Sequence, residues 1–296
     1  MLARSFLWIT QHSAGGRRLL FRWFFELLAR QARHADEWRF MNYGYAEDSD
    51  QLPLDPDDEN ERYCIQLYHH VASCPDLADK DVLEISSGRG GGASYLCRYL
   101  GPRSVTAVDI APSAVAFCRR VYRLAGLRFI QGDAEDLPIF DSSVDIVLNI
   151  EASFCYGDIA RFLAEVRRVL RPGGYFLYAD LRLAEEMDGL RAALRCSGLQ
   201  LERSADITKN VVRALQLDAA RRDAGAARIG PWFLRGAMRL FVGADGTRIP
   251  TCLRDGRMQY HCFALRKPMD EADRREVAPV PVWGSATSAV TAPRVG

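Results

Sequence analysis

Residues 82–93 read Val-Leu-Glu-Ile-Ser-Ser-Gly-Arg-Gly-Gly-Gly-Ala, a short apolar run that ends in a cluster of glycines. An apolar run of this length with turn residues beside it is typical of a buried parallel strand. Glycines directly after such a strand allow a tight turn and let a ligand approach the backbone closely. The stretch therefore predicts a strand, a turn that holds a ligand, and the start of a helix.

Further apolar runs follow along the chain and alternate with helical patterns. The runs occupy residues 104–109, 127–131, 144–150, 175–180 and 258–267. Between them, apolar residues recur at helical spacing from Ile159 to Leu170. The sequence Arg-Pro-Gly-Gly then ends this helix, because proline cannot continue it. Strands that alternate with helices predict an α/β fold with a doubly wound, mostly parallel sheet.

The length of 296 residues suits one large domain with additions. We expect a helical or lid segment over residues 1–60 and the main domain over residues 61–270. Within that domain, residues 183–246 are rich in alanine, arginine and leucine and predict an inserted helical cap. The composition of residues 277–296 predicts a disordered tail.

Charge and cysteine content narrow the class of protein. The 39 Lys and Arg residues nearly balance the 38 Asp and Glu residues, so no basic field favours a nucleic-acid partner. The eight cysteines contain no CxxC pair, which argues against a zinc knuckle and favours reduced thiols in a cytoplasmic protein. The sequence also shows no cluster of metal ligands, and we expect no bound metal.

Residues 19–28 read Leu-Leu-Phe-Arg-Trp-Phe-Phe-Glu-Leu-Leu, which combines aromatic and aliphatic side chains with charge. The run is too short and too charged to span a bilayer. It predicts an amphipathic helix that either packs on the domain or lies on a membrane surface. The sequence leaves both interpretations open, so peripheral membrane contact belongs to the expectation.

An acidic residue at the end of the second strand extends the ligand hypothesis. Asp109 lies 21 positions after Gly88, where a carboxylate can accept hydrogen bonds from both hydroxyls of a ribose. Gly88, Gly90 and Ala93 also fit the G-x-G-x-x-G/A pattern. These residues suit a nicotinamide or flavin nucleotide as well as S-adenosylmethionine. The structural alternative is an aspartate that only caps the following helix.

The turn after the third strand separates these ligands. Asp133 can accept a hydrogen bond from an adenine amino group, and the neighbouring backbone N–H at Ala134 can pair with a ring nitrogen. Gly-Asp-Ala at residues 132–134 and Leu-Arg-Pro-Gly-Gly at residues 170–174 complete the series. Each piece is common alone, but their order and spacing together are specific.

In this order the segments resemble the successive motifs of class I S-adenosylmethionine-dependent methyltransferases. A closer resemblance is to the phthiotriolone/phenolphthiotriolone dimycocerosate methyltransferases, a group that O-methylates a hydroxyl of a long polyketide-derived lipid. It covers residues 40–182 well and rests on segments 40–45, 63–69, 90–96, 151–153, 161–166 and 174–182.

The resemblance implies a Rossmann-like fold with a seven-stranded sheet, S-adenosyl-L-methionine as cofactor, and a small-molecule or lipid acceptor. It also implies which residues hold the cofactor, most of them at strand ends. These are Tyr43, Glu84, Ser86, Gly88, Gly90, Asp109, Ile110, Asp133, Ala134, Asn149 and Glu151.

One departure from that group bears on the chemistry. Where the group has Ala-Ser-His-Cys-Tyr, residues 152–156 read Ala-Ser-Phe-Cys-Tyr, and Phe154 cannot take a proton. A hydroxyl acceptor benefits from a base within hydrogen-bond reach. We expect Asp180, at the carboxyl end of the fifth strand, and His69, just before the core, to be the catalytic residues.

Three other functions stay open on the sequence. The same fold supports methyl transfer to carbon or nitrogen of a small metabolite, which the missing histidine slightly favours. A nucleotide-dependent oxidoreductase would use the same glycine turn and Asp109. A binding protein without turnover would keep the cofactor site alone.

Overall fold

The computed structural model describes residues 14–48, 52–228, 239, 242–244 and 246–269, so the predicted tail at 277–296 lies outside the described part. Its centre is a seven-stranded sheet in the order β3-β2-β1-β4-β5-β7-β6. All neighbouring strands pair in parallel except β7, which is antiparallel to β5 and β6. This confirms the predicted doubly wound, mostly parallel sheet. The strands are β1 (Asp81–Ile85), β2 (Ser104–Asp109), β3 (Leu127–Gln131), β4 (Val144–Ile150), β5 (Leu170–Leu183), β6 (Gln200–Asp206) and β7 (Met258–Arg266).

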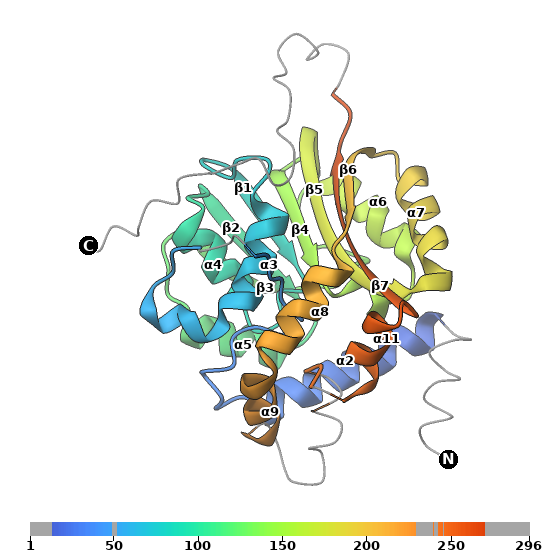
Figure 1. Cartoon of the computed structure of the whole chain (residues 1–296). Coiled ribbons are helices and arrows are strands. Elements are labelled where there is room, and N and C mark those ends of the chain that lie inside the picture. The colour runs from blue at the N-terminus through green and yellow to red at the C-terminus, as the bar shows by residue number, and fades with distance from the viewer. Residues whose placement is uncertain (1–13, 49–51, 229–238, 240–241, 245, 270–296) are drawn as a thin grey trace.

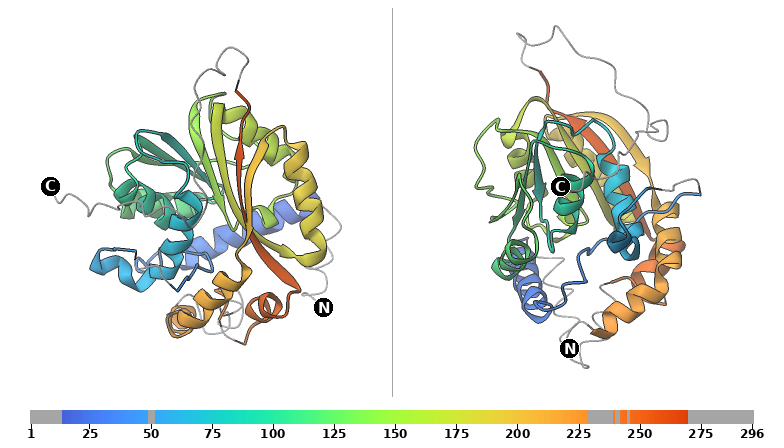
Figure 2. Two further views of the ribbon diagram at one scale, coloured as in Figure 1. Left: turned by 45° about the horizontal axis from the view of Figure 1, so that its top comes forward. Right: turned by 90° about the vertical axis from the view of Figure 1, so that its left-hand side faces the viewer.

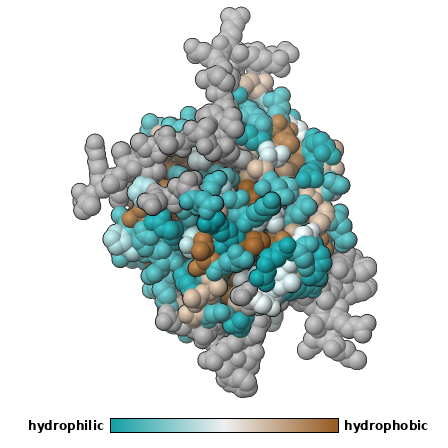
Figure 3. Space-filling model, in the orientation of Figure 1, coloured by the Kyte–Doolittle hydropathy of each residue, from teal (hydrophilic) through white to brown (hydrophobic). Residues whose placement is uncertain are grey.

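Helices cover both faces of the sheet (Figure 1). One face shares a buried core with α3 (Arg62–Ala72), α4 (Gly91–Tyr99), α5 (Pro112–Val121), α8 (Thr208–Leu217) and α11 (Arg248–Arg254). The other face packs against α6 (Ile159–Val169) and α7 (Met187–Cys196). The outer surface in the view of Figure 3 is mainly hydrophilic, with hydrophobic residues in small groups. The apolar side chains of the strands are therefore buried in two layers, one on each face of the sheet.

Helix α6 forms where the sequence predicts it. Asp158 caps its first turn by accepting two backbone N–H groups, and Phe162 and Val166 of the apolar stripe are fully buried. The helix ends at Val169. The Arg-Pro-Gly-Gly segment that follows forms the start of β5, where the register against β4 shifts.

Residues 183–246 are only partly helical, so the prediction of a helical cap over this whole range was wrong. The segment contains the turn η3 (Ala184–Glu186), helix α7 on the sheet, and then strand β6. Most residues of β6 are exposed, because it is the edge strand of the sheet. A strand without an apolar run gives no strand signal in the sequence. Among the described residues of this range, α8 and α9 (Ala219–Arg228) remain as additions of the expected kind.

The N-terminal helix α2 (Ala14–Gln31) lies across the carboxyl edge of the parallel strands (Figure 1) and beside α5 (Figure 2). Glu26 of α2 accepts hydrogen bonds from the N–H and the hydroxyl of Ser113, at the start of α5. Ala29 packs against Ala111 and Ala114. Within the described ranges, no helix is both long and apolar enough to cross a membrane. Helix α2 is thus packed on the domain, directly over the strand ends.

Candidate active site

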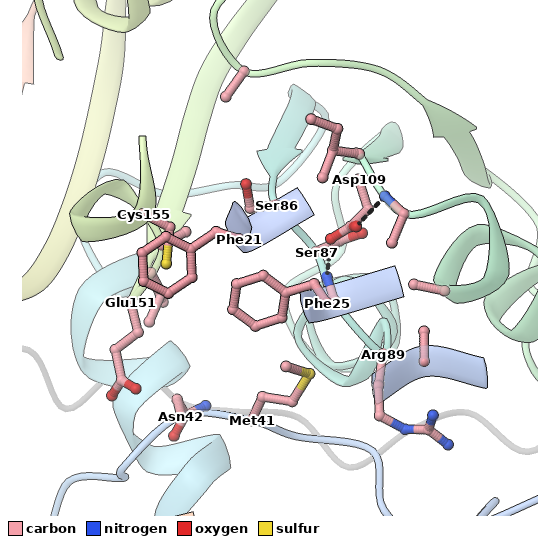
Figure 4. Close-up of a pocket in the computed structure, with 18 of the residues that line it drawn as sticks. Phe21, Phe25, Met41, Asn42, Ser86, Ser87, Arg89, Asp109, Glu151 and Cys155 are labelled. Atoms are coloured by element: carbon pink, nitrogen blue, oxygen red, sulfur yellow. Dashed lines mark hydrogen bonds between the residues drawn. The ribbon is translucent and has the colours of Figure 1, made fainter. Parts of the chain in front are cut away.

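A crevice opens at the carboxyl edge of the sheet, beneath α2 (Figure 4). Its walls come from α2, residues 38–43, the glycine turn after β1, the turn after β2, and segments 133–135 and 150–156. Ligands of open α/β sheets bind outside the carboxyl ends of the strands, so this crevice is where the fold places a ligand site.

The glycine turn after β1 requires backbone angles that favour glycine. Ser86, Gly88 and Gly90 all have positive φ, at 60°, 54° and 75°. A Cβ on Gly90 would lie 2.8 Å from the ring of Phe129, so no larger residue fits there. Ser86 adopts a strained angle for a non-glycine residue, and its hydroxyl contacts the Tyr156 hydroxyl at 2.7 Å. Together these angles turn the chain sharply from β1 into α4.

Asp109 lies at the end of β2, as predicted, and faces this turn (Figure 4). One carboxylate oxygen accepts the Gly88 N–H at 2.8 Å, and the other accepts the Ala111 N–H at 2.9 Å. The side chain is only 8% exposed, and burial raises the pKa of Asp109 to about 6. The two bonds hold the carboxylate in one orientation at the crevice wall.

Asp133 and Ala134 line the crevice at the end that the sequence assigns to adenine. Asp133 accepts the backbone N–H of Glu135 at 3.0 Å. It also pairs with Arg18 of α2, whose guanidinium lies 3.7 Å from Glu135 as well. Helix α2 therefore places a positive charge on the carboxylate that is expected to meet the adenine amino group.

The predicted cofactor residues fall into two groups. Those that line the crevice are Tyr43, Ser86, Gly88, Asp109, Ile110, Asp133, Ala134 and Glu151. Glu84, Gly90 and Asn149 lie behind its wall instead. Glu84 accepts the Tyr68 hydroxyl at 2.6 Å, and burial raises its pKa to about 8. Asn149 donates to the Ile85 carbonyl and the Tyr156 hydroxyl, both at 2.9 Å, so it supports the wall from beneath.

Neither expected catalytic residue lies among the crevice-lining residues. Asp180 is fully buried, pairs with Arg182 at 2.9 Å and accepts the Ser153 hydroxyl at 2.7 Å. His69 contacts the Tyr95 hydroxyl at 2.8 Å, on the side of α3 that faces α4. Both side chains are already engaged away from the crevice, so the structure does not bring either to the site.

The sequence analysis missed the aromatic wall that α2 adds to the site. Phe21 and Phe25 point into the crevice, toward Cys155 and Met41 (Figure 4). The ring of Phe21 meets the ring of Phe154 edge to face, with centroids 6.1 Å apart. The aromatic run at 19–28 was the available signal, but it did not show which part of the domain the helix covers.

The strand order, the glycine turn and the acidic end of β2 define a class I methyltransferase. Residues 83–178 match the family model described as "Methyltransferase domain". The chain is 50% identical over 214 residues to the "Probable phthiotriol/phenolphthiotriol dimycocerosates methyltransferase 2" of Mycobacterium ulcerans (strain Agy99), a match that covers 72% of this chain and 83% of that protein. The chain therefore belongs to the phthiotriol/phenolphthiotriol dimycocerosates methyltransferase family, and its cofactor is S-adenosyl-L-methionine.

Two further comparisons agree with this class. The "Fatty-acid O-methyltransferase" of Mycolicibacterium smegmatis (strain ATCC 700084 / mc(2)155) is 41% identical over 79% of this chain and 85% of that protein. The geranyl diphosphate C-methyltransferase of Streptomyces coelicolor A3(2), solved with S-adenosyl-L-homocysteine, has a TM-score of 0.60 at 18% identity, over 82% of this chain and 97% of that chain. The second likeness shows the fold alone. Family membership decides for a methyltransferase and against the oxidoreductase alternative.

The residues of the crevice fit this cofactor. Each carboxylate oxygen can accept more than one hydrogen bond, so Asp109 keeps acceptor capacity for a ribose after its two backbone bonds. A Cβ on Gly88 would come within 3.1 Å of the Met41 sulfur, which itself lines the crevice. Glycine at this position keeps the space beside Asp109 open.

Proposed function

We propose that the chain transfers a methyl group to a hydroxyl of a long-chain lipid or polyketide-derived acceptor. The observation that carries the proposal is the aromatic wall of Phe21, Phe25 and Phe154 along the crevice. An apolar wall beside the cofactor residues suits an acceptor with a large apolar body and one polar reacting group. Two relatives, named as a phthiotriol/phenolphthiotriol dimycocerosates methyltransferase and a fatty-acid O-methyltransferase, support the same acceptor class.

The residues of the chain would bind the cofactor and the acceptor, orient them toward each other, and exclude water. S-adenosylmethionine, when bound, supplies a methyl group that is already activated. We assign Asp109 to the ribose and the 133–134 turn to the adenine. Phe21 and Phe25 cover the crevice from α2, so they would keep water from the reacting groups and hold the acceptor in place. Correct placement of two reactants can supply about 7–11 kcal/mol of the barrier reduction, so positioning is the main task of these residues.

The test is an acceptor series with the purified full chain. A long-chain diol, palmitic acid and a long-chain amine are incubated with S-adenosylmethionine, and mass spectrometry locates any added methyl group. We expect a methyl ether on the diol. Methylation of the amine alone, or of a carbon atom, would contradict the proposal. Binding of S-adenosylhomocysteine, measured by calorimetry, is the control that the cofactor site is intact.

We also propose that α2 contacts an anionic lipid surface. Leu19 and Trp23 lie one turn apart and are 68% and 65% exposed, beside the exposed Arg22 and Arg30. Exposed apolar residues with neighbouring arginines are typical of helices at a membrane interface. Such contact would bring the opening of the crevice to a membrane-dissolved acceptor.

Vesicle flotation tests this contact. The wild type should float with vesicles that contain phosphatidylglycerol, and the Leu19→Ser/Trp23→Ser variant should float less. Leu201→Ser is the matched control, because Leu201 is 47% exposed on the distant edge strand β6. Equal flotation of all three proteins would exclude α2 as the contact.

A further inference from the structure

Glu151 occupies a special position directly after β4. Its φ is 52°, an angle that non-glycine residues rarely adopt. Its N–H donates to the Ala179 carbonyl at 2.8 Å, which ties the strained residue to β5. Such conformations persist only where the surroundings hold them, and they are concentrated at functional sites. The strained backbone turns the Glu151 side chain into the crevice (Figure 4).

The Glu151 carboxylate is held at one oxygen. Oε1 accepts the Tyr43 N–H at 2.7 Å and the Tyr260 hydroxyl at 3.0 Å. Both hydrogen bonds that the carboxylate accepts from the described residues end on Oε1. The residue is partly accessible, and it lines the crevice. Oε2 is therefore left to accept a hydrogen bond from a molecule in the crevice.

The surroundings of Glu151 shift the pKa of its carboxyl group from the usual acidic range toward neutral pH. The charged and titratable groups that act on it are Tyr43, Tyr68, Asp180, Arg222 and Tyr260. Burial raises the pKa of Glu151 to about 8, whereas the bonds from Tyr43 and Tyr260 and the charge of Arg222 act in the opposite direction. A positive sulfonium nearby would lower the pKa of Glu151 from this raised value toward the working pH. A group with a pKa near the working pH is the most effective general base.

The other acids of the crevice are engaged elsewhere. Asp109 holds two backbone N–H groups, and Asp133 and Glu135 lie at the end assigned to adenine. The histidine that the family resemblance places in the 152–156 loop is Phe154 here, and its ring packs against Phe21. Glu151 is three residues before Phe154, and both residues line the crevice.

We propose that Glu151 is the general base for the methylated hydroxyl. The acceptor O–H bond breaks as its proton passes to Oε2 of Glu151. The acceptor oxygen bonds to the methyl carbon while the carbon–sulfur bond breaks, and that electron pair stays on sulfur, which leaves S-adenosylhomocysteine. Glu151 then returns the proton to water. This inference rests on the proposed function, because a carboxylate acceptor would need no base.

The first test is a pH profile of kcat/KM with the long-chain diol. The wild-type rate should rise with pH until Glu151 is ionised. Glu151→Gln keeps an oxygen for the Tyr43 and Tyr260 bonds but cannot take the proton. It should lose this rise and be slower by about 10²- to 10⁴-fold, the usual contribution of a general base. The rate at which Glu151→Gln methylates palmitic acid should differ little from the wild-type rate, since the carboxylate of this acceptor is already ionised.

A second readout does not depend on turnover. Carbon-13 NMR of protein labelled at its glutamate carboxyl carbons, with S-adenosylhomocysteine bound, follows the ionisation of Glu151, whose signal disappears in Glu151→Gln. Its midpoint should lie well above that of an ordinary glutamate and at or above the midpoint of the pH profile, because S-adenosylhomocysteine lacks the positive sulfonium that lowers the pKa of Glu151. Tyr260→Phe removes a bond that stabilises the carboxylate, so both midpoints should move to higher pH.

The outcomes distinguish failure of the role of Glu151 from failure of the proposed methyl transfer to a hydroxyl. The inference is overturned if Glu151→Gln keeps the pH rise, or if Tyr260→Phe moves neither midpoint. Asp136→Asn is the control, since Asp136 is an exposed acid outside the crevice lining, and its pH rise should persist. If the wild type binds S-adenosylhomocysteine but methylates no hydroxyl, the proposed function fails, and the role of Glu151 fails with it.

Discussion

At the scale of single residues, Asp109 joins the glycine turn to the start of α5. We expect Asp109→Asn to weaken S-adenosylhomocysteine binding by roughly 10- to 100-fold, since a hydrogen bond to a charged group is worth about 1.5–3 kcal/mol. Isothermal titration calorimetry measures the change. The control is Asp136→Asn, an exposed acid on the turn that carries Asp133. Unchanged affinity in Asp109→Asn would remove Asp109 from the cofactor site.

Gly92 lies where α4 passes close to Tyr68. A Cβ on Gly92 would fall 2.0 Å from Cε1 of Tyr68, and Tyr68 is itself fixed by its bond to Glu84. We expect Gly92→Ala to lower the free energy of unfolding by about 1–3 kcal/mol through overpacking, as measured by urea denaturation.

The matched control is Gly189→Ala in α7, where a Cβ would meet no atom within 4 Å. That substitution should raise the free energy of unfolding by about 0.5–1 kcal/mol, because alanine is the better helix former. The same loss in both variants would mean that the contact with Tyr68 is not the cause.

Residues next to a strand end could be placed from the sequence. Ser86, Gly88 and Asp109 lie within a few positions of β1 and β2, so the apolar runs that predict the strands also place these residues at the crevice. Asp180 and His69 could not be judged this way. A pattern puts a residue on a strand or helix, but the direction of its side chain depends on partners such as Arg182 and Tyr95.

At the scale of elements, α2 couples the N-terminal segment to the cofactor site. Arg18 pairs with Asp133, so the adenine amino group has to compete with a guanidinium for that carboxylate. We expect Arg18→Gln to tighten S-adenosylhomocysteine binding by up to about fivefold, since a partly exposed ion pair is worth about 0.2–1 kcal/mol. Calorimetry compares it with Arg30→Gln, whose ion pair with Glu26 lies within α2. Weaker binding in Arg18→Gln would instead indicate that Arg18 contacts the cofactor.

The predictability of an element follows from how its side chains are buried. Strands β1 to β5 and α6 have strongly apolar faces, and their existence was predicted from these patterns. Strand β6 was missed because an edge strand exposes most of its side chains. Helix α2 was expected as a helix, but its position over the crevice depends on contacts with residues about a hundred positions away, such as Asp133 and Ser113.

At the scale of the whole molecule, the carboxyl edge concentrates buried acids. Burial raises the pKa of Glu84 and Glu151 to about 8 and that of Asp109 to about 6. Elsewhere, hydrogen bonds from Arg103 to Asp81 and from Arg168 to Glu165 hold the pKa of these two carboxyls below the usual range. The two groups of acids therefore act in opposite directions on stability as the pH changes.

A carboxyl whose pKa is raised in the folded state stabilises the fold below its unfolded pKa, and this contribution is lost as the pH rises through the folded value. Glu84 and Glu151 should therefore lower the free energy of unfolding of the ligand-free chain between about pH 4.5 and pH 8, and Asp109 between about pH 4 and pH 6, each with a slope of up to about 1.4 kcal/mol per pH unit. Asp81 and Glu165 have lowered values, so their contribution is lost as the pH falls below about 4. Scanning calorimetry should thus find the highest melting temperature near pH 4, and Glu84→Gln, which can still accept the Tyr68 bond, should flatten the decline above that pH. S-adenosylhomocysteine should stabilise more strongly as the pH passes about 6, because the ribose is bound by ionised Asp109. A ligand-free melting temperature that rises from pH 5 to pH 8 would show that these acids are ionised in the fold.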